Sequence, residues 1–174
     1  MRIIGGRASG IQLSCTKHPS LRPTTDRVKE SMFARLGNIR GLIVVDLFSG
    51  SGALGLEALS REAGSVYFFE ENRKYCDLIH ENLTKVAKAM STVGGTKIIR
   101  ADALNVATIL STVKADLIIA DPPYFPDEKI KGAEDLLCNK DIAVWAGDAL
   151  LVLEQSVHSD FLIQSDLCWE VESH

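Results

Sequence analysis

Short apolar runs alternate with helical stretches from residue 41 onward. Each run is bounded by Gly, Pro or charged residues, and together they predict five strands: Leu42–Leu47, Ser65–Phe69, Thr96–Arg100, Ala115–Ala120 and Ala149–Glu154. Helices are expected between them, over 53–62, 72–90, 103–112 and 128–146. Strands that alternate with helices form a mostly parallel sheet with helices on both faces. The pattern therefore predicts an α/β fold.

The first 40 residues have a different pattern. Arg2–Ser14 predicts a short β-hairpin that turns at Gly5-Gly6 or at Gly10. Thr24 or Thr25 is expected to cap a helix that runs to about Leu36. The apolar residues of this helix fall on one face, and these are Val28, Met32, Phe33 and Leu36.

Composition limits the class of protein. A chain of 174 residues with 46% hydrophobic residues and a net charge of −4 is expected to fold as one soluble globule. Its four cysteines form no CxxC pair, which argues against a metal site or a disulfide framework. The N-terminus shows no apolar signal core, and no run of about 18 apolar residues occurs. We expect a reduced, cytoplasmic protein with no metal and no membrane contact.

Charge is unevenly distributed along the chain. Residues 1–40 carry eight Lys/Arg and two acids, a balance of +6, whereas the remaining 134 residues carry 11 basic and 21 acidic residues, a balance of −10. A basic segment on an acidic body predicts local contact with a polyanion, although a solvated terminal segment has the same composition. We therefore divide the chain into a basic N-terminal extension, 1–40, and a catalytic domain, 41–174.

A glycine-rich turn follows the first predicted strand. Gly50, Gly52 and Gly55 satisfy the GxGxxG spacing, which permits a tight turn, close approach of a ligand and close packing of the next helix. Glu70 ends the second strand 18 residues after Gly52, where a carboxylate can bind ribose hydroxyls. This predicts a Rossmann-like cofactor site, which serves nicotinamide dehydrogenases and methyltransferases alike.

The fourth predicted strand runs into Asp121-Pro122-Pro123-Tyr124. An exocyclic amino group of a nucleobase is a poor nucleophile because its lone pair is delocalised into the ring. The Asp121 carboxylate and the Pro122 carbonyl can each accept one amino hydrogen and so orient that lone pair. Pro123 restricts the loop, and the Tyr124 ring offers a surface on which the base can stack.

Four blocks of sequence together resemble the small-subunit (16S) rRNA guanine-N2 methyltransferase family: RIIGGRASGIQL, LRPTTDRVKESMF, DLFSGSGALGLEALSR and ADPPY. The resemblance covers about residues 1–155 and implies a class I methyltransferase domain with a small N-terminal hairpin extension. It also implies S-adenosylmethionine as cofactor, bound by these residues: Asp46, Phe48, Ser49, Gly50, Ser51, Gly52, Glu70, Asp102 and Ala103. Asp102 can instead be an ordinary helix N-cap.

The same resemblance implies that small-subunit rRNA, or the assembling 30S subunit, contacts the basic extension. The residues expected at this contact are Arg7, Arg22, Thr24, Arg27 and Lys29. Arg22 and Arg27 can instead orient the loop against the acidic body. Members of the family have a further strand with an aromatic, basic ending after the position of Trp169. This chain differs from them there.

Three other functions remain compatible with parts of the sequence. A DNA adenine or cytosine amino-methyltransferase also uses an Asp-Pro-Pro-Tyr motif, but a second domain for DNA recognition is not evident. A nicotinamide-dependent oxidoreductase accounts for the glycine turn and leaves Asp121 to Tyr124 unexplained. A non-catalytic RNA-binding assembly factor requires only the basic extension.

Overall fold

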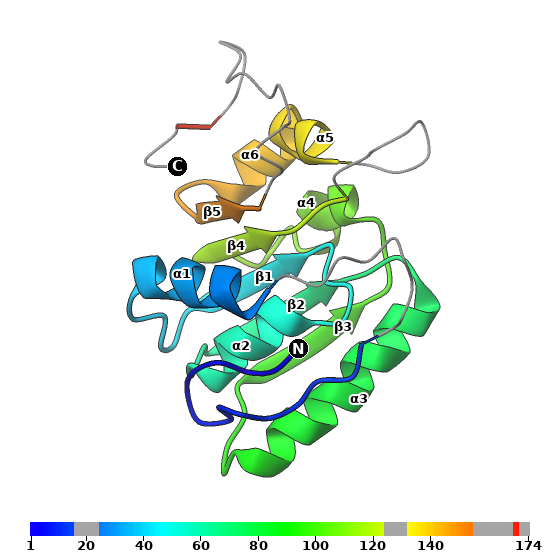
Figure 1. The fold of residues 1–174 in the computed structure, drawn as a ribbon. Coiled ribbons are helices and arrows are strands. Elements are labelled where there is room, and N and C mark those ends of the chain that lie inside the picture. Colours follow the sequence, from blue (N-terminus) through cyan, green and yellow to red (C-terminus); the bar gives the residue numbers. More distant parts are fainter. Residues whose placement is uncertain (16–24, 124–131, 155–168, 171–174) are drawn as a thin grey trace.

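Five parallel strands form one sheet in the computed structural model, which describes residues 1–15, 25–123, 132–154 and 169–170 (Figure 1). The strands are β1 (Ile43–Leu47), β2 (Ser65–Phe69), β3 (Gly95–Ile99), β4 (Leu117–Ala120) and β5 (Leu150–Leu153), and their order in the sheet is β3-β2-β1-β4-β5. The α/β fold and all five predicted strands are confirmed, with ends that shift by at most two residues.

Helices connect the strands much as the sequence predicts. They are α2 (Ala53–Ser60), α3 (Arg73–Ala89), the 3-10 turn η1 (Ala103–Asn105) with α4 (Val106–Ile109), α5 (Ala133–Leu137) and α6 (Lys140–Ala146). The single helix predicted over 128–146 is wrong within the described residues. Helix α5 ends at Leu137, and α6 begins after Asn139. Asn139 caps the start of α6, because its side chain accepts a hydrogen bond from the Ile142 N–H at 3.1 Å.

Alternate side chains of each strand enter two hydrophobic cores on opposite faces of the sheet. Val44 and Phe68 belong to the core beneath the N-terminal residues, α2 and α3, whereas Val45 and Phe69 belong to the core beneath α4, α5 and α6 (Figure 1). Two covered faces account for the nearly continuous apolar runs in the sequence, because the central strands β1 and β4 are buried on both faces.

Helix α1 (Asp26–Leu36) begins at Thr25, whose hydroxyl oxygen accepts a hydrogen bond from the Val28 N–H at 3.3 Å. Phe33 is buried, and Met32 and Leu36 pack against the same core. Val28 stays 36% exposed, so the buried face of the helix is narrower than the sequence predicts. Thr24, the other candidate cap, lies outside the described residues.

The N-terminal segment, residues 1–15, forms a hairpin-like turn with one antiparallel bridge, between Arg2 and Gln12. The Gly10 N–H donates to the Ile3 carbonyl at 2.9 Å, so the turn is formed before Gly10. Ile3 and Leu13 are buried in the same core as α1 and α2. The basic extension is therefore partly integrated into the body of the domain.

No helix within the described ranges is long and apolar enough to cross a membrane. Over the same ranges, no group of three or more His, Cys, Asp or Glu residues is arranged to hold a metal ion.

Candidate active site

The order of the strands reverses between β1 and β4. The chain builds the sheet outward from β1 through β2 to β3, and then returns to the other side of β1 with β4 and β5 (Figure 1). The register aligns Leu47 with Phe69 and with Ala120, so these strands end at one edge of the sheet. Ligands of open α/β sheets bind at such a reversal point, beyond the carboxyl ends of the strands.

The glycine loop, residues 48–52, leaves β1 in a backbone conformation that side chains disfavour. Gly50 and Gly52 have φ of 53° and 79°, and Phe48, which has a side chain, has φ of 59°. The Ser49 N–H donates to the Phe69 carbonyl at 2.9 Å and ties the loop to β2. Strained backbone of this kind is typical of ligand-binding loops.

The third glycine of the motif lies within α2 and serves packing. A Cβ atom at Gly55 would lie 2.4 Å from Cε1 of Phe68 and 2.8 Å from Oδ2 of Asp46. Only glycine therefore allows α2 to approach β1 and β2 this closely, as the GxGxxG spacing predicts.

Glu70 connects the end of β2 to the glycine loop. One carboxylate oxygen accepts the Gly50 N–H and the other accepts the Asn72 N–H, each at 2.8 Å. Burial raises the pKa of Glu70, while these two hydrogen bonds oppose that rise. Each carboxylate oxygen has a further lone pair with which to accept a hydroxyl hydrogen.

Asp46 lies directly below the loop and is 1% exposed. Its Oδ2 accepts the Gly55 N–H at 2.9 Å. Burial, together with the nearby charges of Asp121 and Glu70, raises the pKa of Asp46 to about 7, although the hydrogen bond from the Gly55 N–H opposes the rise. Three carboxyl groups that repel one another at one edge of the sheet favour a ligand that carries positive charge.

The predicted catalytic residues follow β4 immediately. Asp121 is half-buried, Pro122 is buried and Pro123 is exposed, while Tyr124 lies outside the described residues. The electrostatic effect of Asp121 on Asp46 shows that these two carboxyl groups, from β4 and β1, lie near each other.

Asp102 and Ala103 follow β3 at the same edge. Oδ1 of Asp102 accepts the Leu104 N–H at 2.9 Å, so Asp102 caps the η1 turn, which is the alternative role that its position in the sequence left open. Ala103 is 4% exposed. Contact of this pair with a cofactor stays a prediction.

Lys29 is buried, with a side chain that is 0% exposed. Its ammonium group donates to the Arg2 carbonyl and lies 3.9 Å from a carboxylate oxygen of Glu57. Desolvation lowers the pKa of Lys29, an effect that Glu57 opposes. The structure thus places the charge of Lys29 against a buried carboxylate rather than at the surface, and its contact with RNA stays a prediction. Arg27 is exposed, whereas Arg22 and Thr24 lie outside the described residues.

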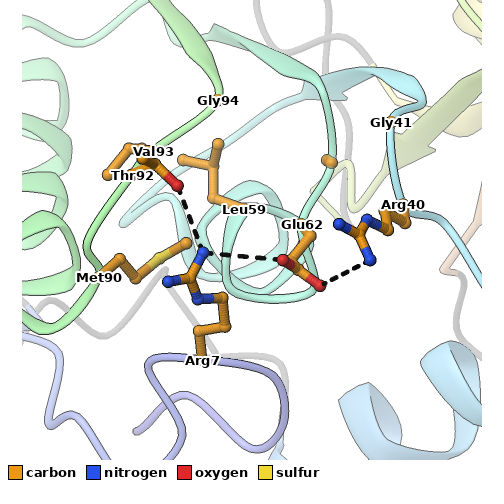
Figure 2. Close-up of a pocket in the computed structure, with 10 residues that line it drawn as sticks. Arg7, Arg40, Gly41, Leu59, Glu62, Met90, Thr92, Val93 and Gly94 are labelled. Atoms are coloured by element: carbon orange, nitrogen blue, oxygen red, sulfur yellow. Dashed lines mark hydrogen bonds and ion pairs between the residues drawn. The ribbon is translucent and has the colours of Figure 1, made fainter.

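Arg7 lines a pocket of about 270 Å³ at the edge of the sheet where the strands begin (Figure 2). Its guanidinium group lies 3.7 Å from Glu62 and donates to Ser91 Oγ at 3.0 Å. Arg40 lies 3.9 Å from the same Glu62 carboxylate. Arg7 is thus at the edge of the sheet opposite Asp121, and the structure does not bring these two residues together.

Three buried polar residues were not predicted from the sequence: Glu57, Ser60 and Asn82. Glu57 is 0% exposed and accepts the Ile4 and Gly5 N–H groups, each at 2.8 Å, so it fixes the N-terminal segment to α2. Asn82, on α3, is also 0% exposed. A single carboxylate within the apolar stretch of α2 was a signal for Glu57, because a buried charge requires partners. The helical pattern around Asn82 gave no such signal.

Comparison with known proteins identifies the relatives of the chain. The model of the family described as "Conserved hypothetical protein 95" matches residues 1–172. The chain belongs to this family. A curated relative, the ribosomal RNA small subunit methyltransferase D of Escherichia coli, is 37% identical over 125 residues, which are 71% of this chain and 60% of that protein. The chain thus spans less than two thirds of that relative, and the resemblance found in the sequence is confirmed.

Solved structures share the fold of the chain. A Thermus thermophilus structure, titled hypothetical protein TTHA0928, is 25% identical with a TM-score of 0.66, and the match covers 89% of this chain and 85% of that one. A precorrin-6y C5,15-methyltransferase from Geobacter metallireducens, 16% identical, shares the fold with a TM-score of 0.61 over 85% of this chain and 70% of that one. The fold is the Rossmann-like fold of class I methyltransferases.

Proposed function

We propose that this protein transfers a methyl group from S-adenosylmethionine to the exocyclic N2 amino group of a guanine in small-subunit rRNA, during or after assembly of the subunit in the cytoplasm. The observation that carries the proposal is that the glycine loop after β1 and Asp121-Pro122 after β4 lie at the same edge of the sheet, on adjacent strands. Membership of the family, and its relative named as an rRNA small subunit methyltransferase, support the substrate.

The residues at this edge of the sheet fit the chemistry of this cofactor. S-adenosylmethionine supplies an electrophilic methyl group on a positively charged sulfonium and also carries an ammonium group. The carboxyl groups of Glu70 and Asp121 provide complementary negative charge, and Asp46, whose pKa is about 7, loses its proton more readily when a cation lies nearby. Phe48 to Gly52 would hold the methionine portion, Glu70 the ribose hydroxyls, and Asp102-Ala103 the adenine.

Asp121 and Pro122 would prepare the guanine for reaction. The Asp121 carboxylate and the Pro122 carbonyl each accept one hydrogen of the amino group, which holds the nitrogen lone pair out of conjugation with the ring. Tyr124 would stack on the base once it leaves its helix. When the nitrogen has gained its methyl group it is cationic, and its surplus proton passes to an Asp121 oxygen or to water.

Tritiated methyl transfer tests the reaction. Small-subunit rRNA and partly assembled subunits, taken from cells that lack this protein, are offered with the labelled cofactor, and the product nucleosides are separated. We expect N2-methylguanosine. Transfer to duplex DNA alone would instead support an amino-methyltransferase of DNA, and RNA binding without any transfer would support an assembly factor.

Two substitutions test the roles of the carboxylates. Asp121→Ala is expected to lower turnover by about 100-fold or more while S-adenosylhomocysteine still binds, because the carboxylate acts on the acceptor base. Glu70→Ala is expected mainly to weaken binding of the cofactor, as measured by isothermal titration. Asp148→Asn is the matched control, since Asp148 is an exposed carboxylate that precedes β5 at the opposite edge of the sheet. Near-normal turnover of Asp121→Ala would contradict the mechanism.

A further inference from the structure

Asn82 joins two segments that are distant in sequence. Its Oδ1 accepts the Ser14 N–H at 2.7 Å, and its Nδ2 donates to the Ser14 carbonyl and to the Ser51 carbonyl, each at 3.0 Å. One amide group on α3 therefore contacts both the end of the N-terminal segment and the glycine loop. Asn82 is 0% exposed, so water does not compete for these three hydrogen bonds.

The contact at Ser14 involves every polar atom of that residue. Besides the two backbone bonds to Asn82, the Ser14 hydroxyl donates to Glu81 at 2.6 Å and accepts a hydrogen bond from Lys85 at 2.6 Å. Ser14 lies ahead of Arg22 and Thr24 in the sequence, two of the predicted RNA contacts. The position of Ser14 itself is fixed by α3.

The contact at Ser51 lies within the predicted cofactor site. Ser51 is flanked by Gly50 and Gly52, both at positive φ, and its own hydroxyl makes one weak contact, 3.9 Å from the Met1 sulfur. The Ser51 carbonyl is held by Asn82, and the Gly50 N–H is held by Glu70. A change in the loop when the cofactor binds would alter the hydrogen bond to Asn82 directly.

We propose that Asn82 is a positioning residue that couples the cofactor loop to the N-terminal segment, so that cofactor and RNA strengthen each other's binding. The inference rests on the proposed function and adds a mechanism of coupling to it. A single planar amide transmits a shift of the Ser51 carbonyl to both polar backbone atoms of Ser14. Such coupling is reciprocal, because the same free energy links the two binding equilibria.

Hydrogen exchange tests the coupling without RNA. Exchange of the backbone amides of residues 10–15 is measured with and without saturating S-adenosylhomocysteine. In the native protein we expect the ligand to slow exchange there by about 5-fold or more, and in Asn82→Ala we expect no slowing although the ligand still binds. Ser14→Ala is the matched control, because it removes the hydroxyl bonds to Glu81 and Lys85 and keeps both backbone bonds to Asn82.

RNA affinity gives the second measurement. The Kd of a small-subunit rRNA fragment is expected to fall about 5- to 10-fold when S-adenosylhomocysteine is added to the native protein or to Ser14→Ala, and to change less than about 2-fold in Asn82→Ala. A purely structural Asn82 would weaken both affinities and leave their ratio unchanged. Asn82→Asp, which keeps the acceptor for the Ser14 N–H, provides a second variant with the same expected loss of coupling.

The outcomes separate this inference from the proposed function. If bound S-adenosylhomocysteine leaves exchange of residues 10–15 unchanged in the native protein, the coupling is refuted, whatever the state of the variants. If exchange slows as expected but no RNA is bound or methylated, the link between the segments stands and the proposed substrate is wrong. If S-adenosylhomocysteine does not bind at all, the proposed function and the coupling both fail.

Discussion

Replacement of Asp46 by asparagine should stabilise the ligand-free protein, and more so as the pH rises. The carboxyl group is buried beneath the glycine loop, and its pKa is raised from 3.8 to about 7. Below about pH 7 the folded protein keeps the proton on Asp46, whereas the unfolded chain releases it near pH 3.8. The folded state thus binds more protons over this range, and its free energy of unfolding falls as the pH rises through it.

The magnitude follows from the same pKa. Between about pH 5 and about pH 7, each pH unit removes about 1.4 kcal/mol, so the native protein loses about 3 kcal/mol of stability and little more by pH 8. Asparagine does not titrate, and its carbonyl oxygen can still accept the Gly55 N–H that Oδ2 of Asp46 accepts now. The advantage of Asp46→Asn over the native protein should therefore grow by about 3 kcal/mol between the two pH values.

Thermal unfolding at about pH 5 and about pH 8 measures this effect. For a chain of this length, about 3 kcal/mol corresponds to about 6–12 °C in Tm. The difference in Tm between Asp46→Asn and the native protein is the quantity compared, because titration of all other groups cancels in it. Asp148→Asn, an exposed substitution, should show no such trend. An advantage of Asp46→Asn that is equal at both pH values would refute the assignment of a buried, proton-holding Asp46.

Three further substitutions test other parts of the structure. Lys29→Met should lower the free energy of unfolding by about 1–3 kcal/mol in urea titrations, because it removes one of the two cations within 4 Å of buried Glu57, the other being Arg61, and should leave the salt dependence of RNA binding unaltered. Arg27→Glu, at an exposed position, should weaken RNA binding and reduce the slope of log K against log salt by about 1 to 2; an unchanged slope would exclude Arg27 from the RNA contact. Gly55→Ala should cost about 1–3 kcal/mol, seen as a lower Tm, because its Cβ would overlap the Phe68 ring.

The sequence by itself determined the elements of the fold and the locations of its site motifs. Apolar runs mark strands because both faces of a parallel sheet are buried, so β1 to β5 were predicted almost to the residue. Glycine spacing marks the predicted cofactor loop because glycine adopts the positive φ of Gly50 and Gly52 at the least cost, and because a Cβ at Gly55 would overlap Phe68. Apolar runs and glycine spacing involve residues that are close in the sequence. Both can therefore be recognised without knowing which distant residues they contact in the fold.

The sequence did not determine which polar residues are buried. Lys29 was assigned to an RNA surface by its charge and its neighbours in the chain, yet the structure pairs it with Glu57 on another helix. The break within the helix predicted over 128–146 was not determined by the sequence either. The Asn139 side chain accepts a hydrogen bond from the backbone of α6 and so starts a new helix there. A propensity does not reveal which of two hydrogen bonds a residue will make.

Only the tertiary structure decided how the glycine loop is connected to the N-terminal segment. Asn82 lies 68 residues from Ser14 and 31 residues from Ser51, and nothing in the helical pattern of α3 indicates either contact. A buried amide is stable only when its donors and acceptor are satisfied, and those partners come from whatever the fold brings alongside. The sequence supplies the residues of such a network, but their spatial proximity exists only after the sheet and helices have packed.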